Sequence, residues 1–99
     1  MATINVWFDK SGNLQVDDLN NAKEGESVTW SIVGGTITAI TQGTAFTAPP
    51  VNTRGTWTAT VETTSLGEKT YNLSAQQTGS TTTKTKPPKV QVNGVVEVL

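Results

Sequence analysis

SVTWSIV, at residues 27–33, is the stretch that decides the fold of this chain. Apolar and hydroxyl-bearing side chains alternate along it with a period of two, which is the pattern of a β-strand with one buried face. We expect Val28, Trp30 and Ile32 to face a hydrophobic core, while Thr29 and the two serines face solvent. The sequence therefore predicts a half-buried strand here.

The same alternation continues on both sides of this stretch. Gly34-Gly35 predicts a two-residue hairpin, because both glycines tolerate positive φ, and the return strand is expected at residues 36–41. No segment supports a helix, and only residues 17–22 could hold a single helical turn. Further strands are predicted at residues 3–8, 13–16, 56–62, 70–76 and 90–92.

Turn and loop signals separate these strands. Turns are expected at residues 9–12 and 66–68, and Asn93-Gly94 predicts a hairpin. Polar connections are expected at residues 17–25 and 77–88. Strands of about six residues between such turns are typical of a β-sandwich or barrel with Greek-key connections.

One face of each predicted strand should contribute to the core. Phe46 is expected to be the buried anchor of the segment that Gly43 and Pro49-Pro50 interrupt. The other inward-facing side chains are expected to be Ile4, Val6, Phe8, Val28, Trp30, Ile32, Trp57, Ala59, Val61, Tyr71, Leu73 and Ala75.

Composition limits what this chain can do. It has 99 residues, which is the size of one domain (residues 1–99), and it contains no His and no Cys. Most side chains that perform nucleophilic catalysis, redox chemistry and tight metal binding are therefore missing. Asp17-Asp18, Glu24 and Glu26 are interpreted as solvent-exposed charges. We predict a non-enzymatic protein with no catalytic, cofactor or metal site.

Charge and hydropathy exclude further classes. Charged residues make up 15% of the chain and the net charge is −1, so a nucleic-acid partner is not expected. Lys84, Lys86 and Lys89 are interpreted as a solvated loop that leads into the next strand. No apolar run approaches the roughly 18 residues that span a membrane. The N-terminus lacks a signal peptide, which predicts either a cytosolic protein or an exported, cell-surface domain whose signal segment is absent from this chain.

Three segments, taken in order, resemble the cupredoxin fold of plastocyanin-like blue-copper proteins. Residues 24–30 (EGESVTW) are similar to that family's Gly-Asp-x-Val-x-aromatic entry into an inner strand. Residues 69–75 (KTYNLSA) are similar to its Gly-x-Tyr-x-aromatic-x-Cys strand, and residues 89–93 (KVQVN) to its closing strand. The resemblance implies an all-β, Greek-key β-sandwich of cupredoxin-like type.

The copper ligands of that family do not carry over. Blue copper needs two His and one Cys, and the family's Cys position falls on Ala75 in this sequence. The following loop, at residues 76–88, offers only amides, hydroxyls and lysines. The resemblance therefore implies a cupredoxin-like sandwich without copper and without electron transfer.

An immunoglobulin-like sandwich is the alternative fold. Tyr71, near the start of a late strand, is similar to the tyrosine corner of that family, and Trp30 to its core tryptophan. Both folds share a two-layer Greek-key architecture, so the functional expectation is the same for either.

Trp7 is the main candidate contact residue. Alternation places it with Thr3 and Asn5 on the polar face of its strand, and an exposed Trp is a good anchor for a partner or a sugar ring. Trp57 is the second candidate, although its strand pattern places it toward the core. Thr56, Thr58 and Thr60 form a row of hydroxyl groups on the opposite face of that strand.

These observations lead to two functional hypotheses. The first is a metal-free β-sandwich module with a structural or protein-interaction role. The second is a carbohydrate- or small-ligand-binding module that uses an exposed Trp. We also expect weak self-association through an unpaired outer strand, either residues 3–8 or residues 95–99.

Overall fold

The structure is a computed structural model that describes residues 1–93. Strands make up 59% of it, and no helix occurs in that range. The chain is therefore all-β, as the alternation predicts. The strands in chain order are β1 (Ala2–Phe8), β2 (Leu14–Val16), β3 (Leu19–Lys23), β4 (Ser27–Ile32), β5 (Gly35–Ile40), β6 (Val51–Thr53), β7 (Thr56–Thr60), β8 (Gly67–Thr70), β9 (Leu73–Gln77), β10 (Thr83–Lys86) and β11 (Lys89–Asn93).

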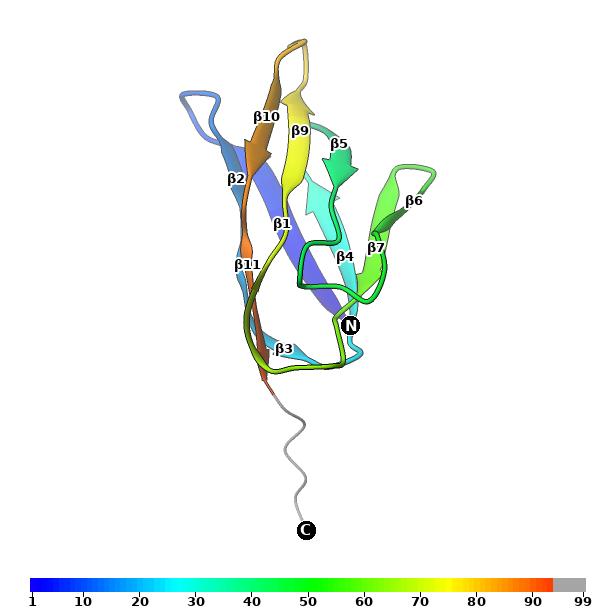
Figure 1. Cartoon of the computed structure of the whole chain (residues 1–99). Coiled ribbons are helices and arrows are strands. Elements are labelled where there is room, and N and C mark those ends of the chain that lie inside the picture. The colour runs from blue at the N-terminus through cyan, green and yellow to red at the C-terminus, as the bar shows by residue number, and fades with distance from the viewer. Residues whose placement is uncertain (94–99) are drawn as a thin grey trace.

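One layer is a five-stranded sheet with the strand order β2-β1-β4-β7-β6 (Figure 1). β1 pairs antiparallel with β2 on one side and parallel with β4 on the other. The expectation that residues 3–8 form an outer strand is therefore wrong, because β1 lies between β2, which pairs with residues 6–8, and β4, which pairs with residues 2–6. The expected outer strand at residues 95–99 and the Asn93-Gly94 hairpin lie outside the described residues.

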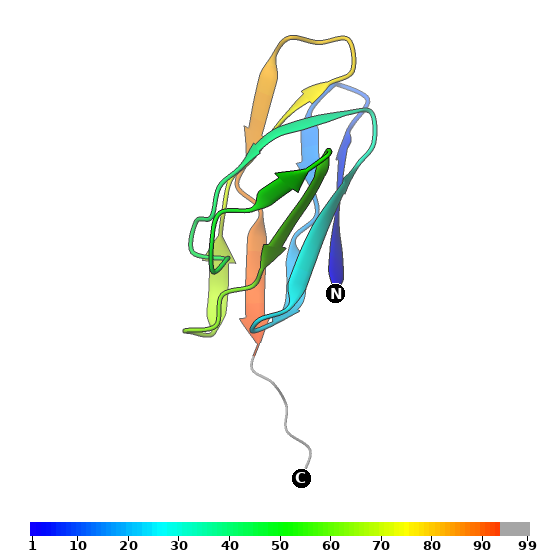
Figure 2. The same cartoon turned by 90° about the vertical axis from the view of Figure 1, so that its right-hand side faces the viewer.

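The second layer consists of two three-stranded sheets, β3-β11-β8 and β10-β9-β5. β8 leads into β9 through Tyr71-Asn72, and β10 leads into β11 through Pro87-Pro88, so the two sheets continue one another along the molecule. Figures 1 and 2 show this layer facing the five-stranded sheet. Several sheets packed in this way are compatible with a β-sandwich.

The segment after β2 crosses from one layer to the other. β2 belongs to the five-stranded sheet, whereas β3 pairs parallel with β11 in the second layer. The expectation of a polar turn, with room for a helical turn at residues 17–22, is therefore wrong. Polar composition hid this strand because three of its five side chains are exposed, while Ala22 is fully buried.

Gly34-Gly35 does not form the expected hairpin. β4 pairs with β1 and β7, whereas β5 pairs with β9, so the chain changes layers at the two glycines. Gly34 has a φ of +79°, but Gly35 is needed for a different reason: a Cβ there would collide with the backbone carbonyl of Gln76. The second glycine therefore permits close approach between strands rather than a turn.

Two further expectations need correction. The expected connection at residues 77–88 contains β10, which pairs antiparallel with β9. The expected strand at residues 70–76 is broken into β8 and β9, and β8 already begins at Gly67, where a turn was predicted. The inward-facing residues of this region are nevertheless correct, because Tyr71, Leu73 and Ala75 are all buried.

An aromatic cluster joins the two layers in the core. Trp30 of β4, Phe46 and Tyr71 make mutual edge-to-face contacts with ring centroids 5.0 to 5.7 Å apart. Trp30 Nε1 donates a hydrogen bond of 3.0 Å to Tyr71 Oη, and burial raises the pKa of Tyr71. The predictions that Trp30 is a core residue and that Phe46 is a buried anchor are confirmed.

Candidate functional site

Trp7 lies on the outer face of the five-stranded sheet. Its side chain is 37% exposed, and it alternates with the buried Val6 and the half-buried Phe8. Gln15 of β2 is directly opposite in the register, and Asn5 is two residues away on the same face. Gln15 donates a hydrogen bond to Asp9 at 3.2 Å. An exposed indole is therefore flanked by two side-chain amides.

Trp57 occupies a different environment. It alternates with the exposed Thr56 and Thr58, so it faces inward, and it is half-buried against the core. β7 is also separated from β1 by β4. The structure therefore does not bring the two candidate contact residues together. Trp57 is also only partly exposed to solvent.

One span of the chain is almost without charge. From Ser27 to Val61 the sequence contains a single charged residue, Arg54. This span forms β4 to β7, and it includes β5 and β6, which lie at the ends of their sheets' strand orders. Both strands lie on the side that Figure 2 turns toward the viewer. Sequence reasoning missed this surface, although the gap between Glu26 and Glu62, interrupted once, is visible in the sequence.

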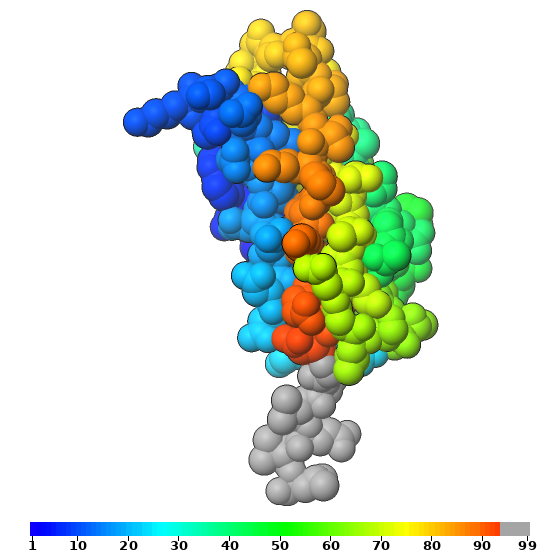
Figure 3. All heavy atoms as spheres, turned by 60° about the vertical axis from the view of Figure 1, so that its left-hand side comes forward, coloured from blue at the N-terminus to red at the C-terminus, as the bar shows by residue number. Residues whose placement is uncertain are grey.

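On the opposite side the two layers contact each other, and charged residues are present. β3 pairs with β11, and β2 lies beside β10, so the chain passes continuously between the layers there (Figure 3). Lys84 Nζ donates to the carbonyl of Gly12, and Lys89 pairs with Glu68 at 3.5 Å. The expectation that Lys84 and Lys86 lie in a loop is wrong, because both belong to β10.

The edge strand β6 is protected by its local structure. It has only three residues and follows Pro49-Pro50. Arg54 and Gly55 have φ values of 53° and 88°, as in a type I′ hairpin, and Asn52 Oδ1 accepts a 2.9 Å hydrogen bond from the Gly55 amide. A short edge strand flanked by proline and charge resists pairing with another chain.

The edge strand β5 has fewer of these protections. It has six residues and contains neither proline nor charge. Within the described part of the chain it pairs with β9 alone, which leaves its other side with unpaired backbone groups. Its one blunting feature is a register irregularity between Ile37 and Ala39. β5 is therefore the edge most open to an added strand.

A hollow of about 340 Å³ lies on the outer face beside β6. Thr29 and Thr58 form part of its floor, and Pro49 and Val51 are among its other lining residues. Apart from the N-terminal amine of Met1, which also lines it, the hollow is uncharged. It extends the uncharged surface from the β5 side onto the face of the sheet.

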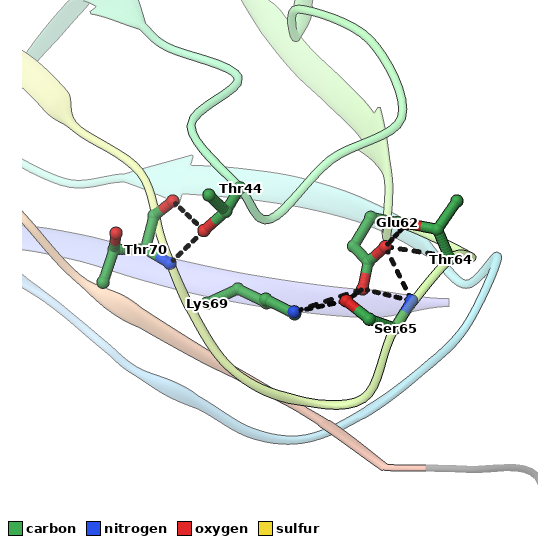
Figure 4. Close-up of polar contacts among 6 residues, drawn as sticks. All are labelled: Thr44, Glu62, Thr64, Ser65, Lys69 and Thr70. Atoms are coloured by element: carbon green, nitrogen blue, oxygen red, sulfur yellow. Dashed lines mark hydrogen bonds and ion pairs between the residues drawn. The ribbon is translucent and has the colours of Figure 1, made fainter.

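Glu62 is the one buried charged residue that the described residues contain, with 7% of its surface exposed (Figure 4). Its carboxylate accepts hydrogen bonds from the Thr64 amide at 2.8 Å and the Thr64 hydroxyl at 2.7 Å, and from the Ser65 amide at 3.2 Å. Lys69 Nζ lies 3.8 Å away. The Thr64 hydroxyl and amide, together with Ser65 and Lys69, lower the pKa of Glu62.

The same cluster brings Ser65 and Lys69 together. Lys69 donates a hydrogen bond to the Ser65 hydroxyl, which superficially resembles a Ser–Lys nucleophile pair. Lys69 Nζ also lies against the carboxylate of Glu62, at 3.8 Å. The carboxylate fixes the loop between β7 and β8. Beside it, an open pocket of about 550 Å³ is lined mainly by hydroxyl groups.

The copper that a cupredoxin resemblance implies does not fit this chain. Ala75, at the family's Cys position, is fully buried in β9 and has no ligating atom. Among residues 1–93 no three His, Cys, Asp or Glu side chains cluster closely enough to hold a metal ion.

Over the same range there is also no helix long and apolar enough to cross a membrane.

No protein-family model matches this chain, and no curated protein matches it. Function is therefore inferred from the surfaces described above.

Proposed function

We propose that the chain is a non-enzymatic β-sandwich module that binds a protein partner by strand addition at β5. The observation that carries the proposal is the unpaired, uncharged side of β5, next to an otherwise charge-depleted span. In strand addition, main-chain hydrogen bonds supply the affinity. No side chain of β5 opposes an incoming strand with a charge.

We propose a cupredoxin-like, Greek-key topology for this sandwich. The three segments of the resemblance fall on β4, on β8 and β9, and on β11. β4, β9 and β11 are inner strands of their sheets, whereas β8 ends its sheet. β1 pairs parallel with β4, and β3 pairs parallel with β11. Immunoglobulin constant-type domains are built from two antiparallel sheets, so the parallel pairs favour the cupredoxin-like alternative.

A peptide titration tests the proposed interaction. The probe is a blocked peptide of alternating Thr and Val, and the control is the same peptide with a central proline that removes a backbone donor. In amide NMR spectra of the full chain, the probe should shift the β5 signals and leave β10 unchanged. The proposal fails if no β5 signal moves, or if the proline peptide acts equally.

The exposed Trp7 supports a second candidate, a carbohydrate-binding module. An indole face flanked by Asn5 and Gln15 supplies a stacking surface and amide hydrogen-bonding groups. Titration with soluble glycans should move the Trp7 indole signal and leave the Trp30 signal in place. Trp7→Ala should abolish the response, and an unchanged Trp7 signal with every glycan would exclude this candidate.

A further inference from the structure

We infer that the partner which adds to β5 is a second copy of this chain, paired antiparallel through its own β5. This inference rests on the proposed function and names its partner. In such a pair, the β10-β9-β5 sheets of the two copies would join into one sheet across a twofold axis, and each copy would present the same surface to the other.

Charge is the first step toward this assignment. In a strand that pairs antiparallel with itself across a twofold axis, a charged side chain close to the axis lies near its own copy, where like charges repel. A strand for a different partner has no such restriction and commonly carries charges complementary to that partner. β5 has no charge, and neither do its chain neighbours from Ser27 to Thr53. This pattern suits self-pairing better than pairing with an unrelated strand.

The strand inventory is the second step. An uncharged strand with a free side is needed to face β5, and β4 and β7 are excluded because each has neighbours on both sides. β6 has a free side, but it is three residues long and is flanked by Pro49-Pro50 and Arg54. β2 also ends its sheet and carries no charge, but it is three residues long and Asp17 follows it. Among the described strands, β5 is the longest uncharged strand at the end of a sheet. The net charge of −1 also keeps repulsion between copies small.

The expected complex is weak. Two six-residue strands would pair over a limited area, below the ~1,200 Å² of stable interfaces. The irregularity between Ile37 and Ala39 shortens the regular ladder further. We therefore expect association that depends on concentration rather than a permanent dimer.

Sedimentation of the full chain from micromolar to millimolar concentration provides the test. The mass should rise from that of one 10.5 kDa chain toward that of two. Thr38 is exposed and lies in the middle of β5, so Thr38→Lys should abolish the rise. Thr56→Lys, on the outer face of β7, changes the charge equally and should leave the rise intact.

A charge-swap experiment adds a positive readout. Thr38→Lys and Thr38→Glu should each stay monomeric alone, and an equimolar mixture should associate, because opposite charges then face each other across the axis. Isotope-filtered NMR on a mixture of labelled and unlabelled wild-type chains should show contacts between copies at β5. Circular dichroism confirms that each variant remains folded.

Contrary outcomes are distinct. A mass that stays at one chain up to millimolar concentration overturns the inference, as do intermolecular contacts at another edge or equal loss in Thr56→Lys. If the chain remains monomeric while the Thr-Val peptide still shifts β5, the partner is another protein and the proposed function stands. If the peptide also fails, both are wrong.

Discussion

The two sides of this molecule differ in the strands that form the edges of the sheets. On one side the chain crosses between layers through β2 and β3, and Lys84, Lys86 and Lys89 decorate β10 and β11. On the other side β5, β6 and β8 end their sheets. β8 carries Glu68 and Lys69, whereas Arg54 is the one charge between Ser27 and Val61. Both sides share one core, so the contrast concerns the surface rather than stability.

This contrast teaches where association can occur. Exposed strand edges attract other strands unless charge, proline, brevity or a bulge opposes them. The charged side has bonds that tie strand to strand, such as Asp18 Oδ1 accepting a 2.9 Å hydrogen bond from the Lys89 amide. On the other side, β6 is protected against pairing with another strand by its short length, by proline and by Arg54. The one such protection of β5 is its bulge. The following changes break or sharpen this difference.

Removal of Phe46 should have the largest effect, because its ring joins the two layers of the core that both sides share. Phe46 contacts Trp30 from one layer and Tyr71 from the other, and it is 2% exposed. Phe46→Ala should lower the free energy of unfolding by about 3–5 kcal/mol, measured by urea denaturation. Thr47→Ala, at the exposed neighbour, should stay within about 0.5 kcal/mol.

Alanine substitutions at Gly35 and Gly34 should lower stability by different amounts, because the two glycines have different roles where the chain crosses between the layers. Gly35→Ala forces a Cβ against the Gln76 carbonyl and should cost about 1–3 kcal/mol. Gly34→Ala meets no neighbouring atom but is strained at positive φ, and should cost about 1 kcal/mol. Equal stability losses would contradict the different roles that the structure gives these glycines.

Acid should weaken the border between the two sides, where Glu62 holds the loop into β8. Its pKa is lowered from 4.5, so its contribution is fully present above pH 4.5 and is lost as pH falls through the lower folded pKa. Glu62→Gln should therefore flatten the decline of stability in acid. Thr64→Val, which removes one donor, should give an intermediate profile. A Glu62→Gln profile that matches the wild type would refute this role.

The smallest expected effect is a gain in stability at the tip of the β6–β7 hairpin. Arg54 has a φ of 53°, and this conformation costs a non-glycine residue roughly 1–2 kcal/mol, less for Asn. Arg54→Asn should raise the free energy of unfolding by about 0.5–1 kcal/mol. The substitution also removes the one charge between Ser27 and Val61. We therefore expect self-association, measured by sedimentation, not to decrease.

Local alternation predicted the strands well where one face is apolar. Ile4 and Val6 of β1 and Val28 and Trp30 of β4 are buried as expected. It failed at β3 and β10, whose side chains are mostly polar and whose existence depends on distant partners. For the candidate site, the sequence predicted the exposure of Trp7. It did not predict that β5 is an edge strand, because the alternation of side chains within a strand does not specify which strands pair with it.

The sequence by itself determined that the chain is all-β, that the apolar faces of its clearly alternating strands turn inward, and that His and Cys chemistry is absent. These properties follow from a period of two and from composition, both of which are local. Only the tertiary structure decided that β1 is interior, that β5 is an edge and that Gly34-Gly35 crosses between layers. Strand pairing joins residues far apart in the chain, so the free edge depends on the whole set of pairings.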